Sequence, residues 1–406
     1  MGKILFLHPD LGIGGAERLV VDAALALKQK GHSVEFITNH HDPSHCFEET
    51  RDGNLKITVV GDWLPRHLFG KCYALCAYLR LLYAALYILL FVPANETPDV
   101  IFCDQISIGI PLLKLFSFQR FCVIFYCHFP DLLLSKPGGF LKTCYRMPLN
   151  WLEEYTTSKA DAILVNSKFT SKIFKTTFQK ISTTPKILYP SINTKVIDNF
   201  QIPSKLDDID ANERFILSIN RYERKKDISL VLKSFAILQC LTDEHIKLVV
   251  IGGYDERVVE NVEYYEELKS LAEKLKINAK TIFMKSPSDA DKFYLLKHCS
   301  CLVYSPQNEH FGIVPLEAMY VGKPVVACNS GGPTETIEDS VNGFLCDAEP
   351  EKFAQAILKS IQKQNELSKK GEEIFKTKFS FNAFSDQLNY IISNQMKQTN
   401  VIHKSK

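Results

Sequence analysis

This 406-residue sequence lacks an excess of charge of either sign. It has 48 Lys and Arg against 46 Asp and Glu, so its formal net charge is only +2. A protein that binds a polyanion through much of its surface usually carries a clear excess of positive charge. The sequence therefore gives no reason to expect nucleic acid as a partner. Internal repeats and low-complexity stretches are missing as well.

Paired cysteines are also missing, although the chain has 12 cysteines. No CxxC pair occurs, so we expect reduced thiols rather than a zinc site or a disulfide framework. The N-terminal run MGKILFLHPDLGIGG has no small-residue cleavage site and is expected to be a first strand, not a signal peptide. Both absences favour a functional part in the cytosol. Cysteines in apolar surroundings, expected to be buried, are Cys72, Cys76, Cys122, Cys127, Cys299 and Cys301.

Short apolar runs alternate with helical patterns twice along the chain. Such runs, rich in Val and Ile, are typical of a parallel sheet covered on both faces. At roughly 100–200 residues per domain, the length also predicts two domains. The runs of the first set are 3–7, 33–38, 56–60, 99–103, 122–127 and 162–166. Those of the second set are 214–219, 246–251, 280–284, 301–304 and 324–328.

The predicted fold class is therefore α/β, with two doubly wound, Rossmann-like domains. A polar, Pro-containing stretch at 198–213 separates the two sets of runs. We expect domains at 1–200 and 201–375, followed by a segment at 376–406 whose helix packs back on the first domain. Ligands of such sheets bind outside the carboxyl ends of the strands, so a cleft between those ends is predicted.

Residues 72–92 carry a single charged residue, Arg80, in 21 positions. That length would span a bilayer. A single crossing would nevertheless put strands 33–38 and 99–103 of one sheet on opposite sides of the membrane, which excludes it. Two alternatives are left: a buried core helix, or a helix that lies in or dips into a membrane face. We favour the second, because most helices of soluble domains keep a polar stripe.

The strongest polar constellation is SPQNEHFGIVPLEAM at 305–319. It follows an apolar run and opens a predicted helix at Pro315, since proline fits the first helical position. The loop before the proline is expected to point backbone amides at an anion, which the helix dipole also favours. A diphosphate fits such a loop. Its residues include Phe311, Gly312 and Ile313.

Two carboxylates of this segment are candidates for the sugar nucleotide. Glu317 is expected in the first turn of the helix, where it can accept hydrogen bonds from a ribose diol. Glu309 lies on the preceding loop, closer to a sugar linked to the phosphate. The structural alternative for Glu317 is that it only stabilises the start of a helix.

Residues 325–335, VVACNSGGPTE, repeat this pattern. They predict a strand, a loop with Gly331 and Gly332, and a second helix start led by proline. A second turn of this kind is again suited to an anion, and it is expected to converge on the same site.

A basic run, NRYERKK at 220–226, follows the first strand of the second domain. Arg221 and either Lys225 or Lys226 are expected to neutralise a leaving diphosphate, which gains charge when a glycosidic bond to phosphate breaks. The alternative is an ordinary solvated basic run.

In the first domain, Gly12, Gly14 and Gly15 form the loop after the first strand. Their spacing is too irregular for a dinucleotide fingerprint, but it allows close approach of backbone to a ligand. His128 follows strand 122–127, at a carboxyl end that favours a site over a purely structural role. A cluster of His40, His41 and His45 lacks the ligand spacing of a metal site, so no metal is predicted.

These residues together resemble the donor site of family 4 retaining glycosyltransferases with the GT-B fold. The resemblance covers nearly the whole chain. Longer strings are similar to the members of that family that add the alpha-1,3 and alpha-1,6 mannoses of the dolichol-linked oligosaccharide. Those strings are FLHPDLGIGGAERLV (6–20), FYCHFPDLLLSK (125–136), INRYERKK (219–226), GGYDERV (252–258) and NEHFGIVPLEAMY (308–320).

The resemblance implies GDP-mannose as donor and a mannosylated chitobiosyl diphosphodolichol as acceptor. It also implies work at the cytosolic face of the endoplasmic reticulum, membrane contact through 72–92, no cofactor, and other enzymes of the pathway as possible partners. By the family pattern, Glu317 would hold the ribose and Glu309 the mannose. Arg221 with Lys226 would hold the diphosphate, and His128 would contact the mannose. Gly14 and Gly15 would let amides approach the phosphates.

Two other functions stay open at this point. One is another family 4 enzyme, which extends the glycan with alpha-1,2 mannose or uses a UDP-sugar. The other is a catalytically silent scaffold that binds a sugar nucleotide. Loss of turnover in a folded Glu309→Ala variant would separate a transferase from the scaffold.

Overall fold

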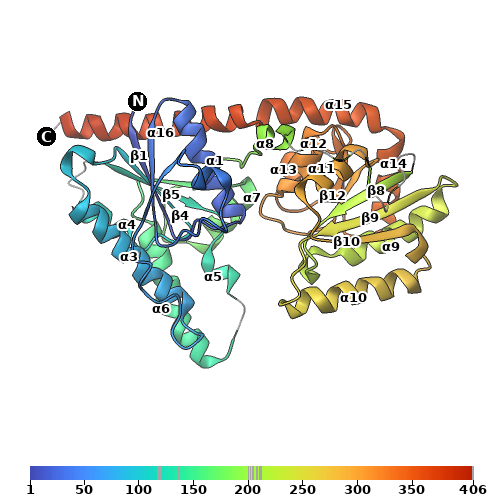
Figure 1. Cartoon of the computed structure of the whole chain (residues 1–406), viewed down its shortest axis with the longest axis horizontal. Coiled ribbons are helices and arrows are strands. Elements are labelled where there is room, and N and C mark those ends of the chain that lie inside the picture. Colours follow the sequence, from blue (N-terminus) through green and yellow to red (C-terminus); the bar gives the residue numbers. More distant parts are fainter. Residues whose placement is uncertain are drawn as a thin grey trace. The chain divides into compact units, whose positions relative to one another are not determined.

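A computed structural model describes residues 1–116, 121–135, 138–199, 201, 203, 205–206, 209 and 213–404. The chain folds into two compact units, Met1–Pro190 with Phe381–Lys406 (unit 1), and Ser191–Ser380 (unit 2). Each contains one twisted parallel sheet with helices on both faces (Figure 1). The predicted α/β class with two doubly wound sheets is confirmed.

Unit 1 has a seven-stranded sheet of order β3-β2-β1-β4-β5-β6-β7, and its strand pairs are parallel. The central strands are almost wholly apolar and buried, as expected for a sheet covered twice. The last strand is only two residues long and was not predicted. The strands are β1 (Lys3–His8), β2 (Ser33–Thr38), β3 (Lys56–Val59), β4 (Val100–Asp104), β5 (Cys122–Cys127), β6 (Ala162–Val165) and β7 (Lys186–Ile187).

Helices cover both faces of this sheet. One apolar cluster joins the sheet to α1 and α16, which run beside each other (Figure 1), and the other joins it to α3, α4, α6 and α7. The helices are α1 (Gly15–Gln29), α2 (Glu48–Arg51), α3 (Tyr73–Phe91), α4 (Ile110–Phe116), α5 (Asp131–Leu134), α6 (Phe140–Thr157), α7 (Lys168–Thr177) and α16 (Phe381–Lys404).

The apolar segment 72–92 forms α3, which packs one face on the sheet and leaves the other exposed. Its one charge, Arg80, is turned inward and pairs with Asp62 (2.8 Å), while its guanidinium also donates to the Asn39 oxygen (2.7 Å). Because the strands before and after α3 belong to one sheet, the helix does not cross from one side of a membrane to the other. Its exposed apolar residues are Tyr73, Leu75, Leu79, Tyr83, Leu86, Leu90 and Phe91.

Unit 2 has a six-stranded parallel sheet of order β10-β9-β8-β11-β12-β13. Its strands are β8 (Arg214–Ile219), β9 (Ile246–Gly252), β10 (Thr281–Lys285), β11 (Leu302–Tyr304), β12 (Val325–Cys328) and β13 (Gly343–Cys346), the last of which was not predicted. Its helices are α8 (Thr194–Asn199), α9 (Ile228–Leu241), α10 (Val259–Lys274), α11 (Asp289–His298), α12 (Ile313–Tyr320), α13 (Pro333–Thr336), α14 (Pro350–Gln362) and α15 (Gln364–Ile374).

The units divide at Pro190 and at Ser380, rather than at 200 and 375. Helix α8 belongs to unit 2 because Asp198 accepts a hydrogen bond from the hydroxyl of Tyr320 on α12. The polar stretch 198–213 lies partly outside the described residues. The helix expected within 376–406 begins only at Phe381, because a π-helical turn (Phe375–Phe379) precedes it and ends at Ser380 in extended conformation.

Helix α16 is anchored to unit 1 by polar contacts. The hydroxyl of Ser385 donates to the backbone oxygen of Ala26 (3.2 Å), and Asn389 is hydrogen-bonded to His32 (2.8 Å). The C-terminal helix thus packs on the same unit as the N-terminal strand.

All 12 cysteines are free thiols. Of the six expected to be buried, Cys72 is half-buried and the other five are buried.

Candidate active site

The basic loop after β8 is fixed by the end of β9. Tyr222 is fully buried, and its amide donates to the backbone oxygen of Gly253 (3.1 Å). Its hydroxyl lies 3.0 Å from a backbone oxygen of β10. A Cβ at Gly252 would lie 1.8 Å from the backbone oxygen of Asn220, so only glycine allows these two backbone segments to pack so closely. The loop that carries the cations is therefore held by buried contacts.

The cations of this loop face different surroundings. The side chains of Arg221 and Lys225 are 71% and 72% exposed, and both pair with Glu223 at 3.5 and 3.0 Å. The side chain of Lys226 is only 17% exposed, and its ammonium pairs with Glu309. Of the two adjacent lysines, it is thus Lys226 that contacts a predicted sugar-binding carboxylate.

Glu309 lies on the loop after β11, where two side chains hold its carboxylate. Lys226 pairs with it, and the buried hydroxyl of Tyr304 is hydrogen-bonded to it. Burial raises the pKa of Glu309, but the charge of Lys226 outweighs burial and leaves this pKa below its ordinary value. An ionised carboxylate beside a cation is suited to holding hydroxyl groups rather than to donating a proton.

Helix α12 begins at Ile313, earlier than predicted. Gly312 precedes it with φ of 88°, a conformation that L residues rarely adopt, so the glycine allows this early start. Pro315 is therefore the third helical residue, where its missing N–H costs no helical hydrogen bond. Glu317 lies beyond the first turn, so the expectation that it stands in that turn is wrong.

Half of the Glu317 carboxylate has no partner. Its Oε1 accepts a hydrogen bond from Lys292 on α11 (3.1 Å), whereas its buried Oε2 has no hydrogen-bond partner among the described residues. Burial raises the pKa of Glu317, and Lys292 offsets only part of that effect. A buried oxygen that lacks a donor costs about 1–3 kcal/mol. A ligand hydroxyl is the kind of group that would relieve this cost.

Gly331 and Gly332 pack against the backbone of the Glu309 loop. Gly331 has φ of 67°, and a Cβ there would lie 2.4 Å from the oxygen of Glu309. A Cβ at Gly332 would lie 2.2 Å from the Cα of Phe311, and the Gly332 amide donates to the Glu309 oxygen (2.7 Å). The contacts seen here hold the loop that carries Glu309, and a direct part in anion binding stays a prediction.

In unit 1, His128 shares a buried carboxylate with a second histidine that was not predicted. Oδ1 of Asp104, at the end of β4, lies 2.8 Å from Nδ1 of His8, at the end of β1. Oδ2 of Asp104 lies 3.1 Å from Nε2 of His128. Burial raises the pKa of Asp104, but the two histidines outweigh it and leave the pKa below its ordinary value. The ring of His128 is thus held by a hydrogen bond between its Nε2 and the buried carboxylate of Asp104.

Beside this group, the glycine loop opens on a pocket of about 430 Å³. Gly15 starts α1, and nothing lies within 4 Å of a Cβ built on it, whereas a Cβ on Gly14 would lie 2.2 Å from the Glu17 carboxylate. The wall of the pocket is polar and is formed by Asp10, Gly12, Ile13, Glu17, His40, Asp42, His45 and Arg66.

Two histidines of the cluster at this pocket contact protein groups. Nδ1 of His40 lies 3.0 Å from Asp62, and His41 is hydrogen-bonded to Thr50 (3.3 Å). Across the described ranges, no group of three or more His, Cys, Asp or Glu is placed to hold a metal ion. Independence from metal and cofactor stays a prediction, because reactivity decides it.

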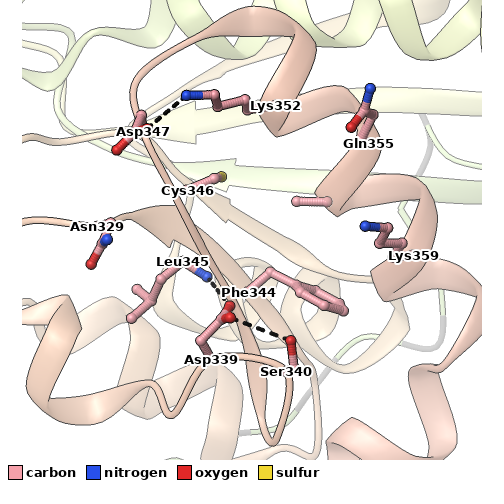
Figure 2. A pocket seen from close by; sticks show the side chains of 11 residues that line it. Asn329, Asp339, Ser340, Phe344, Leu345, Cys346, Asp347, Lys352, Gln355 and Lys359 are labelled. Atoms are coloured by element: carbon pink, nitrogen blue, oxygen red, sulfur yellow. Dashed lines mark hydrogen bonds and ion pairs between the residues drawn. The ribbon is translucent and has the colours of Figure 1, made fainter.

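A second hollow, of about 310 Å³, lies between the edge strand β13 and α14 in unit 2 (Figure 2). Three of its charged side chains are already engaged: Lys352 pairs with Asp347 (2.7 Å), and Asp339 accepts from the amide of Leu345 (2.9 Å). None of the predicted site residues lines this hollow.

Most predicted residues thus lie in unit 2, where three chain segments bring Lys226, Glu309, Gly331 and Gly332 together. Phe311 and Gly312 lie on the loop before α12, and Ile313 and Glu317 lie on that helix. Arg221 and Lys225 lie on the same loop but point into solvent. Gly14, Gly15 and His128 lie in unit 1. Sequence reasoning missed His8 and Asp104, as well as Tyr304 and Lys292, the partners of the two glutamates.

Comparison with known proteins gives the family. Residues 13–196 match the family described as Glycosyltransferase Family 4, and residues 203–377 match Glycosyl transferases group 1. Alpha-1,3/1,6-mannosyltransferase ALG2 of Homo sapiens is 51% identical over 398 residues, covering 95% of this chain and 94% of that protein. The protein of the same name from Dictyostelium discoideum is 44% identical over 417 residues, covering 96% and 97%.

Solved structures agree on the fold. Sucrose-phosphate synthase from Thermosynechococcus elongatus superposes with a TM-score of 0.74 at 17% identity, covering 98% of this chain and 100% of that one. Anabaena HepE in complex with UDP-glucose gives 0.65 at 18% identity, with coverage of 97% and 100%. At such identities the likeness concerns the fold alone, which is the predicted GT-B fold.

Proposed function

We propose that this chain, which belongs to the alpha-1,3/1,6-mannosyltransferase family of glycosyltransferases, transfers mannose from GDP-mannose to a dolichol-diphosphate-linked oligosaccharide. The enzyme is a mannosyltransferase, and the proposed acceptor is the Man-GlcNAc2 core, which receives an alpha-1,3 and then an alpha-1,6 mannose. The observation that carries the donor side is the Lys226–Glu309 pair, which puts a cation for a diphosphate next to a carboxylate for a sugar.

In this proposal, different residues of unit 2 contact the ribose, the mannose and the diphosphate of the nucleotide sugar. Glu317 accepts hydrogen bonds from the ribose through Oε2, the buried oxygen for which the described residues offer no donor. Glu309 accepts from hydroxyls of the mannose. The backbone amides of Gly312 and Ile313, at the start of α12, approach the diphosphate, because the first amides of a helix lack intrahelical acceptors.

Transfer in this proposal depends on stabilising the leaving group. Negative charge grows on the diphosphate as its bond to mannose breaks, and in this proposal Lys226, which pairs with Glu309, compensates that charge together with Arg221 of the same loop. Lys225, which points into solvent, has the lesser part. The low pKa of Glu309 argues against a general acid at this position. No carboxylate is assigned as nucleophile, and the anomeric configuration of mannose is retained.

Unit 1 provides the membrane contact of this proposal. The outer face of α3 exposes a row of Leu and Tyr side chains, while Arg80 is turned away from it. Helix α6 lies beside α3 (Figure 1), and the two are joined by a hydrogen bond in which the Tyr145 hydroxyl accepts from the Leu75 amide (3.0 Å). Helix α6 also exposes large apolar side chains, namely Phe140, Leu141, Met147, Trp151 and Tyr155. An apolar face of this kind suits a helix lying in the membrane interface. The membrane we propose is that of the endoplasmic reticulum, with the enzyme on its cytosolic face.

Product analysis tests the proposed reaction. Purified protein is incubated with radiolabelled GDP-mannose and the one-mannose lipid acceptor, and the released glycans are sized and digested with linkage-specific mannosidases. Two added mannoses, one alpha-1,3 and one alpha-1,6, are expected. A product with one added mannose would remove the dual linkage, and activity only with a UDP-sugar would remove the donor.

A further inference from the structure

His8 is a buried imidazole whose two nitrogens both face acceptors. Nδ1 lies 2.8 Å from the carboxylate of Asp104, and Nε2 lies 2.8 Å from the backbone oxygen of Asp10. A backbone carbonyl can only accept, so Nε2 must carry a proton. The two histidines leave the pKa of Asp104 below its ordinary value, so this carboxylate is ionised and also only accepts, and Nδ1 must carry a second proton. The geometry and the ionised Asp104 together give the imidazolium form of His8.

His32, the other buried histidine of unit 1, shows the opposite arrangement. Its Nδ1 lies 3.1 Å from the amide of Gly2, which can only donate, so this nitrogen carries no proton. Its Nε2 lies 2.8 Å from Oδ1 of Asn389, which can only accept. His32 is therefore neutral. Two buried histidines of one unit thus differ in charge because their partners differ.

The surroundings of His8 supply its counter-charge. Burial lowers the pKa of His8, but Asp104, and then Glu17 at 3.8 Å, outweigh burial and leave this pKa raised. Cys103 on β4 and Tyr126 on β5 also interact with Asp104, and burial raises the pKa of each, so both stay neutral. Asp104 and His8 thus form a buried ion pair whose charges cancel.

We propose that His8 and Asp104 are positioning residues that keep His128 neutral, with its Nε2 protonated and its Nδ1 presented as an acceptor to a sugar hydroxyl. Oδ2 of Asp104 accepts from Nε2 of His128, which fixes the tautomer. Since His8 already compensates the carboxylate, His128 need not. Among the described residues, Nδ1 of His128 has no protein partner. The proposal rests on the proposed function, in that the hydroxyl belongs to the sugar substrate.

Nitrogen-15 NMR of the histidine side chains tests the charge of His8 directly. The full chain is labelled at its imidazole nitrogens, held in detergent micelles at pH 7.5, and assigned with His8→Asn, His32→Asn and His128→Asn variants. We expect imidazolium shifts for both nitrogens of His8, and neutral shifts for His32 and His128, with the proton on Nε2 in each. A neutral His8, or a His128 protonated at Nδ1, would overturn the proposal.

The pH profile of kcat/KM tests the consequence for His128. In the His8→Asn variant the new side-chain amide can still donate to Asp104 from the position of Nδ1, but the positive charge is gone. The Asp104 carboxylate, no longer compensated, then stabilises the protonated form of His128. In that form Nδ1 cannot accept a hydrogen bond from a sugar hydroxyl. As the pH is lowered, the activity of His8→Asn is therefore expected to disappear at a higher pH than the activity of the wild type. Above the pH of this acid limb, its rates should stay within about tenfold of the wild type.

Controls separate this role from a purely structural one. His32→Asn, which changes a neutral histidine outside the group, is expected to leave the position of the acid limb unchanged. A His8→Asn enzyme that is slower at every pH by one factor would contradict the proposal. If the wild type transfers no mannose, the proposed function fails, whereas the NMR spectrum still decides the charge of His8.

Discussion

The two units hold the carboxylates of the candidate site with different cations. In unit 2, Glu309 and Glu317 are paired with Lys226 and Lys292. In unit 1, Asp104 is held between two histidines instead. Lysine stays charged throughout the physiological range, whereas histidine changes its charge within it. From this difference we expect the part of the pH dependence that comes from a change in cation charge to originate in unit 1.

The largest effect is expected where unit 2 pairs a cation with the sugar-binding carboxylate. Lys226→Ala should lower kcat/KM for GDP-mannose by roughly 100- to 1000-fold, because the leaving diphosphate loses its nearest cation. The loss should be the same from pH 6 to 9. Lys225→Ala is the matched control, since its side chain points into solvent, and it should stay within about threefold of the wild type. Equal losses in the two variants would remove the distinction between the lysines.

A smaller effect is expected at the carboxylate with the unpartnered oxygen. Glu317→Gln should weaken GDP binding about tenfold, because the amide replaces a charged acceptor for the ribose. Isothermal titration calorimetry gives the affinity. Glu351→Gln, on the exposed first turn of α14, is the control that should bind GDP like the wild type. A Glu317→Gln variant with unchanged affinity would exclude Glu317 from the nucleotide site.

The same contrast explains which residues sequence reasoning could find. The unit 2 residues lie in three short segments, each directly after a strand, so the pattern of a strand followed by a polar loop identified them. His8 and Asp104 each stand one residue beyond a predicted strand, at 3–7 and 99–103. The rule that selected His128, a polar residue at the carboxyl end of a strand, would have selected both.

Other details needed three dimensions. The helix start at Ile313 depends on the positive φ of Gly312, which a sequence does not display. Helix α6 contains Pro148, and an interior proline normally argues against a helix, so the sequence alone does not favour this helix. The choice between Lys225 and Lys226 depends on a difference in exposure between neighbours that have the same chemistry.

A third prediction tests whether the proposed membrane contact is confined to the surface of unit 1. Leu86, on the outer face of α3, is 41% exposed, and Leu86→Glu should lower binding to phospholipid vesicles about tenfold, since a buried leucine contributes roughly 1.5–3 kcal/mol. Leu241, on α9 of unit 2, is 45% exposed, and Leu241→Glu should bind vesicles like the wild type. Co-sedimentation measures both. Equal losses would show that the contact is not confined to unit 1.

The smallest effect concerns the pH dependence of stability. The pKa of His8 is raised in the folded protein, so its stabilising contribution is complete below the unfolded value of about 6.5 and is lost as pH rises through the folded value. Below pH 6.5, His8→Asn should therefore unfold at a temperature roughly 5 °C lower than the wild type. Thermal denaturation between pH 6 and 9 should show this gap closing as pH rises.

The direction of that change distinguishes the two kinds of ion pair. Lys226→Ala removes a lysine instead of a histidine, so the difference between its unfolding temperature and that of the wild type should not vary between pH 7 and 9. A constant gap for His8→Asn would mean that His8 is neutral in the folded protein. The source of any pH dependence would then have to lie outside the Asp104 group, and the contrast between the units would fail.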